Sequence, residues 1–214
     1  MSTSTQCKSG SIETALWLLG LLCISAFGVS KIHSARAQST AISELETQWR
    51  KEVASDPDQS LWSTQRIAHY ELARSQSDEL PPIALLNIPS VDIRVAVFEG
   101  TSDRVLDIGI GRVSGTAEIG VSGNLALAGH RDGYFRGLKD IAIGDEISIQ
   151  HADGIDHYSV TELLVVKPDA IHVLDPTAES ILTLVTCYPF YFVGSAPERF
   201  IVRAVSKQTE VFSQ

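Results

Sequence analysis

The chain has 214 residues, a formal net charge of −9 and 44% apolar residues, which is enough for one well-formed domain and an additional segment. The part after Ala37 contains 14 basic and 25 acidic residues, a net charge of −11, and no basic cluster. Because nucleic-acid binding depends on neutralising phosphates, this charge balance argues against nucleic acid as a partner.

The N-terminal region contains one long apolar stretch. It predicts a transmembrane helix over residues 14–32, which follows a short tail of residues 1–13. Ala35-Arg36-Ala37 resembles a signal-peptide cleavage site, so a cleaved leader is the alternative to a retained anchor. More basic residues follow the stretch than precede it, and by the positive-inside rule this would place the rest of the chain in the cytoplasm. The flanking charges alone therefore do not settle the orientation.

Residues 33–79 are expected to form a helical stalk. Apolar residues at helical spacing predict a first helix, which ends at Asp56-Pro57-Asp58. A second helical segment is expected from about Ser60 to Ser75, before Pro81-Pro82. The stalk either serves as a spacer between membrane and domain or packs its apolar face on the domain and covers a groove.

From Ile83 onward, short β-rich runs alternate with turn signals, and residues 80–214 are interpreted as one domain. The expected strands are Ala84–Ile88, Arg94–Glu99, Asn124–Gly129, Glu146–Gln150, Asp156–Val166, Ile181–Cys187 and Phe200–Val205. Seven or eight short strands with little helix between them predict a mainly β fold, an antiparallel barrel or sandwich. Side chains fill the interior of a barrel of this size, so chemistry is expected at strand ends and in loops.

Cys187 is the only cysteine that follows the apolar stretch, because Cys7 precedes the stretch and Cys23 lies inside it. A domain outside the cytoplasm with one cysteine makes no internal disulfide. Its free thiol is therefore either buried as a small hydrophobe or used as a nucleophile.

A nucleophilic thiol needs a base and a group that stabilises oxyanion charge. His130 ends an apolar run and opens a polar loop, whereas the other five histidines lack such a position. Cys187 ends one expected strand, and Arg199 begins the next one twelve residues later. The three residues can therefore meet at one end of a barrel. From spacing alone, a hydrogen-bonded turn histidine, a buried thiol and a surface arginine paired with Glu198 or Asp132 remain the alternatives.

The same segments resemble the sortases, a family of membrane-anchored cysteine transpeptidases. Thr183-Leu-Val-Thr-Cys187 resembles the TLxTC motif of the family, and Asn124–Asp132 is similar to the strand and loop of its catalytic histidine. Arg199 matches the position of the catalytic arginine. The resemblance covers roughly Pro82 to Val205, and the sequence Cys187–Gly194 is most similar to the class D-like group of Gram-negative bacteria. It implies a closed antiparallel or mixed β-barrel of about eight strands.

The resemblance also implies an activity. Cys187 would attack an LPxTG-like C-terminal sorting signal of a protein substrate and form a thioester, with Arg199 stabilising the oxyanion. His130 would protonate the leaving amine and then deprotonate an amine acceptor on the cell envelope. The alternatives are a sortase-like peptidase that mainly hydrolyses its substrate, or a non-catalytic tethered β-barrel binding module in which Cys187 is inert.

The resemblance implies no cofactor. A calcium site of the kind that some sortases have would draw on scattered acidic residues, Glu99, Asp103, Glu118 and Asp169. The family also implies a single-pass protein of the inner or cell membrane, with the catalytic domain on the extracytoplasmic side.

Overall fold

The computed structural model describes residues 57–60, 62–75, 80–191 and 196–211, all of which belong to one compact unit, Ser55–Gln214. The predicted tail, the predicted transmembrane helix and the first stalk helix lie outside the described residues. Among the described helices, none is long and apolar enough to cross a membrane.

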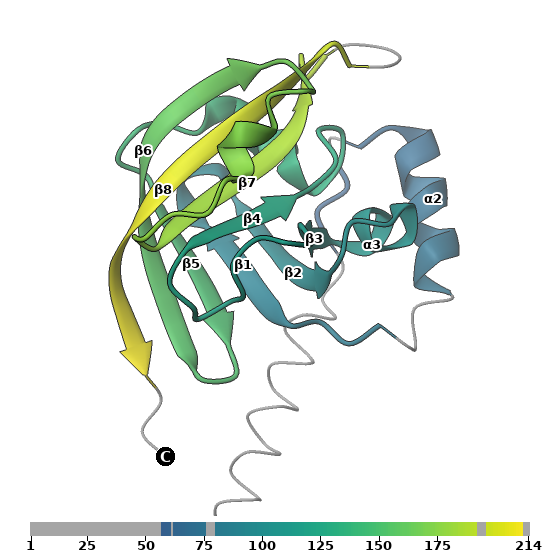
Figure 1. The fold of residues 1–214 in the computed structure, drawn as a ribbon. Helices are drawn as coiled ribbons and strands as arrows, with labels where there is room; N and C mark the ends of the chain where they lie inside the picture. The colour runs from purple at the N-terminus through teal and green to yellow at the C-terminus, as the bar shows by residue number, and fades with distance from the viewer. Residues whose placement is uncertain (1–56, 61, 76–79, 192–195, 212–214) are drawn as a thin grey trace, which may run out of the picture. The chain divides into compact units, whose positions relative to one another are not determined.

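Eight strands and several short helices make up the described part of the chain (Figure 1). The strands are β1 (Ala84–Ile88), β2 (Ile93–Glu99), β3 (Ile110–Arg112), β4 (Asn124–Ala128), β5 (Glu146–His151), β6 (Gly154–Val166), β7 (Ile181–Tyr188) and β8 (Glu198–Val211). The helices are α2 (Thr64–Arg74), α3 (Asp103–Ile108) and the 3₁₀ turns η1 (Pro89–Val91), η2 (Tyr134–Asp140) and η3 (Ile171–Leu174).

The strands close into a barrel in the order β1-β2-β3-β4-β7-β8-β6-β5. Two neighbouring pairs, β2 with β3 and β4 with β7, are parallel, and the other pairs are antiparallel. The prediction of a mainly β, closed barrel of about eight strands with mixed pairing is therefore confirmed. Because β4 and β7 are parallel, both strands run toward the same end of the barrel (Figure 1).

Alternation along β4 and β7 decides which side chains enter the barrel. Leu125 and Leu127 of β4 pair with Leu182 and Leu184 of β7, and all four are buried in the core cluster. The residues between them on each strand point to the outer side, because successive side chains of a strand face opposite ways. Burial of this leucine set fixes the register, since a slip by one residue would turn it outward.

Strand β3 and helix α3 were not expected from the sequence. The three residues of β3 are too few to show a periodic pattern. The backbone of β3 passes so close to Gly100 that a Cβ on Gly111 would lie 1.9 Å from the Gly100 carbonyl oxygen. Glycine is therefore required inside this strand, where it otherwise indicates a break.

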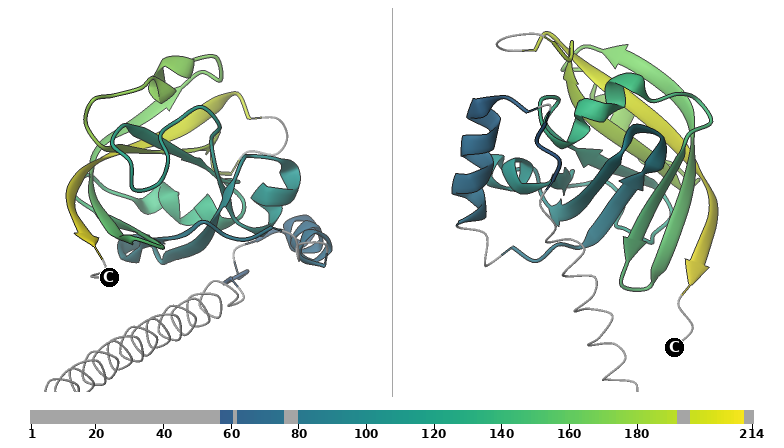
Figure 2. Two further views of the ribbon diagram at one scale, coloured as in Figure 1. Left: turned by 60° about the horizontal axis from the view of Figure 1, so that its bottom comes forward. Right: turned by 180° about the vertical axis from the view of Figure 1, so that it is seen from behind.

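Helix α2 packs on the rest of the compact unit, which agrees with the packing part of the second stalk interpretation. Its N-cap is Ser63, whose hydroxyl accepts a hydrogen bond from the Arg66 amide at 3.2 Å. The helix buries Tyr70, and the Trp62 ring meets the rings of Tyr70 and Tyr134 edge to face, with centroids 5.7 and 4.9 Å apart. Helices α2 and α3 lie side by side in both views of Figure 2.

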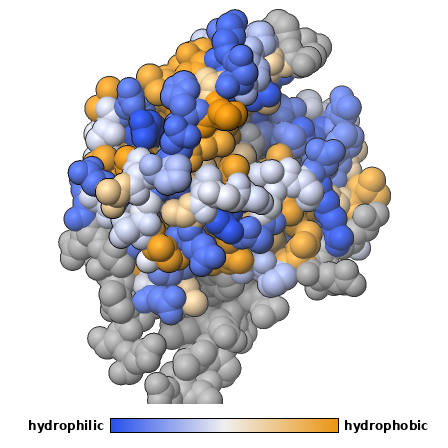
Figure 3. Space-filling view, viewed as in Figure 1, coloured by the Kyte–Doolittle hydropathy of each residue, from blue (hydrophilic) through white to orange (hydrophobic). Residues whose placement is uncertain are grey.

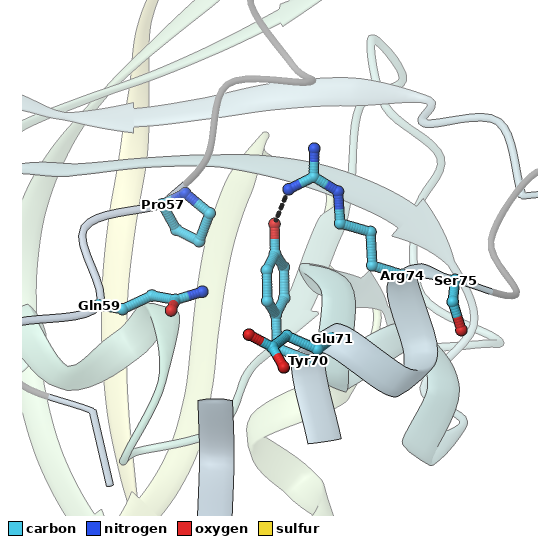
Figure 4. Close-up of a pocket in the computed structure, with 6 residues that line it drawn as sticks. All are labelled: Pro57, Gln59, Tyr70, Glu71, Arg74 and Ser75. Carbon is cyan, nitrogen blue, oxygen red and sulfur yellow. Dashed lines mark hydrogen bonds between the residues drawn. The ribbon is translucent and has the colours of Figure 1, made fainter. Parts of the chain in front are cut away.

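A hollow beside the C-terminal end of α2 is lined by Pro57, Gln59, Tyr70, Glu71, Arg74 and Ser75 (Figure 4). The Arg74 guanidinium crosses this hollow and donates a hydrogen bond of 2.9 Å to the Tyr70 hydroxyl. None of the three predicted catalytic residues lines it.

The burial of Leu127 predicts a large loss of stability on truncation. Leu127→Ala should lower the free energy of unfolding by about 2–5 kcal/mol, because it removes buried methyl groups and leaves a cavity. Leu72→Ala is the matched control, since Leu72 on α2 is 62% exposed. Urea denaturation followed by circular dichroism measures both. Equal effects of the two substitutions would contradict the assignment of Leu127 to the core.

Candidate active site

The register of three neighbouring strands brings the predicted site residues into one row. Cys187 on β7 and Arg199 on β8 are directly paired. The last paired residues of β4 and β7 are Ala128 and Val185. The residues that follow continue the same alignment. The Gly129 amide donates to the Val185 carbonyl at 3.1 Å, which carries the alignment one step beyond β4.

A second hydrogen bond, from the Thr186 hydroxyl to the Gly129 carbonyl at 2.8 Å, holds the same junction. The register therefore places His130 opposite Cys187. Because adjacent strands lie about 4.8 Å apart, the backbones of Cys187 and Arg199 are neighbours, and His130 follows the residue that makes the last backbone hydrogen bond to β7. Paired residues on adjacent strands also point to the same face, so the three side chains share the outer side of the barrel.

Cys187 is a free cysteine with partial exposure, which rules out the interpretation of a fully buried thiol. The preceding row on the same face consists of Ala128, Val185 and Ile201, which are small or apolar. Figure 3 shows one face of the molecule, with apolar residues gathered in its upper half between polar ones. Ile201 is only 1% exposed, so the partly exposed Ala128 and Val185 are the apolar residues of this row that an extended peptide beside the thiol can contact.

Aromatic rings support the ends of β7 and β8. The rings of Tyr188, Phe190 and Phe200 lie within 5.4–6.2 Å of one another, centroid to centroid. Phe200 pairs with Thr186 on the inner side of the sheet, next to the row that carries Cys187 and Arg199. A packed inner face holds the backbone of both residues in place, which a reactive group needs.

The Arg199 guanidinium is held by its own loop in this structure. Its Nη1 donates to the backbone carbonyls of Ala196 and Glu198, at 3.4 and 3.0 Å. Both contacts keep the cation at the start of β8, beside Cys187 in the register. One alternative was a surface ion pair between Arg199 and the Glu198 carboxylate. In the structure Arg199 instead donates to the backbone carbonyl of Glu198.

His130 has a partly buried side chain, 27% exposed, and its Nε2 lies 3.7 Å from Oδ1 of Asp107 on α3. Burial is the main cause that lowers the pKa of His130 below its ordinary value, and the Arg66 cation lowers it further. The carboxylates of Asp132, Asp107 and Asp103 oppose this shift. At neutral pH the net effect favours the uncharged imidazole.

Side-chain hydrogen bonds of other polar residues hold the neighbouring loops against β4 and β7. Asn124 accepts a hydrogen bond from the Thr183 hydroxyl at 2.7 Å and donates to the carbonyls of Val173 and Asp175 at 3.0 Å each. The segment between β6 and β7 is thereby tied to the outer side of β4 and β7. Thr183 and Asn124 belong to the two motif segments, but no pattern in the sequence indicates that their side chains form a hydrogen bond.

The loop after His130 is joined to the segment after Cys187. Arg131 donates to the Pro189 carbonyl at 3.1 Å, and Arg136 donates to the Phe190 carbonyl at 3.4 Å. The Arg136 guanidinium also lies over the exposed Tyr191 ring, 4.6 Å from its centroid. These contacts couple the positions of the histidine loop and the cysteine strand end.

The acidic residues considered for calcium do not form a cluster. In the part of the chain that the structure describes, no three His, Cys, Asp or Glu side chains are grouped as metal ligands. Glu99 instead accepts two hydrogen bonds of 2.8 Å from Arg112.

A partly exposed thiol, an imidazole and a guanidinium in one row define the class of enzymes with a cysteine nucleophile. A family model described as the Sortase domain matches residues 86–207, which is more than half of the chain. The chain belongs to the sortase family.

Relatives and solved structures agree with this family. Sortase D of Bacillus subtilis (strain 168) is 31% identical over 119 residues, which cover 55% of this chain and 60% of that protein. The structure of a Clostridium perfringens Sortase D5 transpeptidase has 28% identity and a TM-score of 0.55, covering 67% of this chain and 94% of that chain.

Sortase E1 from Streptomyces coelicolor, solved with a tripeptide in its active site, has 29% identity and a TM-score of 0.55, covering 61% of this chain and 90% of that chain. The chain spans about 60% of the length of the first curated relatives that it matches.

The partial exposure of Cys187 predicts that a thiol reagent reaches it in the native protein. Treatment of the full chain with iodoacetamide, followed by peptide mapping, should show alkylation at Cys187, faster at higher pH because the thiolate is the reactive form. The Cys187→Ala variant is the control for the mapped peptide. An unmodified Cys187 in the folded protein, with full modification after unfolding in urea, would contradict the accessible site.

Proposed function

We propose that the protein is a cysteine transpeptidase that cleaves an LPxTG-like sorting signal and transfers the acyl group to an amine acceptor. The observation that supports the proposal is the direct pairing of Cys187 with Arg199, together with the alignment of β4 and β7 that leads to His130 just beyond the end of β4. Acyl transfer through a thioester requires a nucleophile, a proton carrier and a group that stabilises the oxyanion, and we assign these roles to Cys187, His130 and Arg199.

In the proposed reaction, the Cys187 thiolate attacks the carbonyl carbon of the threonine in the signal. Arg199 stabilises the oxyanion that forms, by charged hydrogen bonds. The peptide C–N bond then breaks as His130, in its imidazolium form, gives a proton to the leaving amine. The acyl group remains on Cys187 as a thioester.

The acceptor amine completes the reaction. His130 takes a proton from this amine as it attacks the thioester carbonyl, and the new amide bond releases Cys187. The first step needs a thiolate and an imidazolium together, although burial lowers the pKa of His130. Only part of the enzyme is then in the competent protonation state at neutral pH.

A peptide substrate is supported by the tripeptide in the active site of the Streptomyces coelicolor sortase. The partly exposed Ala128 and Val185 next to the row of Cys187 suit the apolar residues of such a signal. The relatives named Sortase D and Sortase D5 support a class D-like enzyme, as does the sequence that follows Cys187. We assign the protein to that group as found in Gram-negative bacteria.

The proposal includes a single-pass anchor formed by residues 14–32 in the inner or cell membrane, with the catalytic domain on its extracytoplasmic side. The apolar stretch supports the anchor, and the single cysteine of the domain is compatible with an oxidising compartment. The partners are then a protein that carries the sorting signal and an amine on the cell envelope.

Incubation of the protein with an LPxTG-type peptide library, with and without an amine acceptor, tests the function. A thioester on Cys187, detected by intact mass, and a new amide product with the acceptor are expected. Cleavage alone at all acceptor concentrations would indicate a hydrolytic peptidase. The absence of both thioester and cleavage across the library would support a binding module.

Substitutions in the row predict graded losses of transfer. Cys187→Ala should abolish the thioester, and His130→Ala should reduce transfer about 10²–10⁴-fold through loss of acid–base catalysis. Arg199→Ala should reduce it about 10²–10³-fold through loss of oxyanion stabilisation. Steady-state kinetics with a fluorogenic signal peptide measures all three.

Arg203→Ala is the matched control for Arg199→Ala. Arg203 lies on the same strand and the same outer side, but it pairs with Thr183, four residues from Cys187, and its Nη1 is 3.8 Å from Glu162. Transfer by this variant should stay within a few-fold of the wild-type rate. Equal losses in the two arginine variants would remove the specific role of Arg199.

A further inference from the structure

Helix α2, which precedes the barrel in the chain, reaches the histidine of the site. Arg66 in its first turn forms an ion pair between Nη1 and Oδ1 of Asp107 on α3. The same Asp107 oxygen is the one that lies 3.7 Å from Nε2 of His130. One carboxylate oxygen is therefore shared by an arginine and the proposed catalytic imidazole.

The sharing is unequal in this structure. Arg66 makes a hydrogen bond to Asp107, whereas the 3.7 Å separation from His130 is too long for a hydrogen bond. A second nitrogen of Arg66, Nη2, lies 3.3 Å from Oδ1 of Asp132, which follows His130 in the chain. Arg66 and Asp107 are only 13% and 15% exposed, so solvent screens their charges weakly.

The fold holds Arg66 in this place. The Ser63 cap fixes the first turn of α2, and the rings of Trp62, Tyr70 and Tyr134 pack the helix onto the histidine loop. The Tyr134 hydroxyl donates to the Ile108 carbonyl at 2.8 Å, which ties that loop to the end of α3. The Arg66 side chain also lies beside the backbone of this loop, with its Cδ 3.6 Å from the position that a Cβ on Gly133 would take.

We propose that Asp107 is a positioning residue for His130, and that Arg66 of α2 competes with the imidazole for the Asp107 carboxylate. Asp107 orients the ring through Nε2 and stabilises the imidazolium by its charge, as a carboxylate does behind a catalytic histidine. An imidazolium that meets Asp107 with Nε2 has Nδ1–H left to give to the leaving amine. Arg66 opposes the positive form by its own charge and by its hold on the carboxylate.

The charged groups around His130 come from every element packed against it. They are Arg66 from α2, Asp103 and Asp107 from α3, and Asp132 from the histidine loop. Arg66 lowers the pKa of His130, and Asp107 raises it. Loss of the Arg66 charge therefore increases the imidazolium fraction at a given pH, and loss of the Asp107 charge decreases it.

This inference rests on the proposed function for its catalytic meaning, but its test needs no substrate. The full chain, labelled with ¹³C at histidine rings and carrying Cys187→Ala, is titrated by NMR, and the His130 signal is assigned by its loss in His130→Gln. Arg66→Gln should raise the His130 midpoint above that of the parent, and Asp107→Asn should lower it. Arg66→Lys keeps the positive charge and should return the midpoint toward the parent value.

Arg74→Gln is the matched control, because it removes the same charge from the same helix at its other end, where Arg74 contacts Tyr70. It should leave the His130 midpoint unchanged. Unchanged midpoints in both Arg66→Gln and Asp107→Asn would overturn the proposal. A shift in Arg74→Gln equal to that in Arg66→Gln would also overturn it, since the effect would then be the general field of the helix.

Kinetics provide a second readout in the enzyme with Cys187 restored. Asp107→Asn should lower kcat about 10- to 100-fold with little change in KM, the loss found when an outer carboxylate that orients an imidazole is removed. If Asp107→Asn does not fold, the proposal is tested by the His130 midpoints of the remaining variants, Arg66→Gln, Arg66→Lys and Arg74→Gln. Midpoint shifts as expected in a protein without transfer activity would leave the Asp107 role standing and reject the proposed function.

Discussion

The parallel pairing of β4 with β7 is the constraint on which the whole site depends. These strands come from distant parts of the chain, and their alignment is fixed by leucines that face each other inside the barrel. The Thr186 and Gly129 hydrogen bonds carry that alignment past the last paired residue of β4. A slip of one residue would bury the thiol and turn core residues outward, so the stability of the core and the geometry of the site are set by the same contacts.

The three site residues are held in place in two different ways. Cys187 and Arg199 lie on directly paired strands, so the sheet alone brings them together. His130 lies beyond the end of β4, and its surroundings come from outside the barrel, from α3 and from α2 through Arg66. The thiol and the guanidinium are thus placed by the barrel. The electrostatic environment of the imidazole is set by helices that cover the barrel.

Short β-rich runs between turn signals predicted most of the strands, but they left a barrel and a sandwich open, and only the family resemblance implied a closed barrel. The prediction of the site residues depended on motif residues at the ends of expected strands. Helix α3 and β3 were missed since both are short and β3 contains a glycine. The pairing of Arg66 with Asp107, 41 residues apart, could not be predicted, because charged residues on separate short elements carry no sequence pattern that identifies their partner. The interpretation of residues 33–79 as a stalk also gave no reason to expect a contact between Arg66 and Asp107.

Because α2 contacts the histidine loop, the surroundings of His130 include residues that precede the barrel in the chain. A fragment that begins at residue 80 would contain the barrel and all three residues of the row, yet it would lack Arg66 and Trp62. Asp107 would then face His130 without its competing cation, and the Tyr134 ring would lose its aromatic neighbour. The proton affinity of such a fragment's histidine would differ from that of the intact protein. The paired strands carry the thiol and the guanidinium, whereas the segment before them supplies a charge that lowers the pKa of the imidazole.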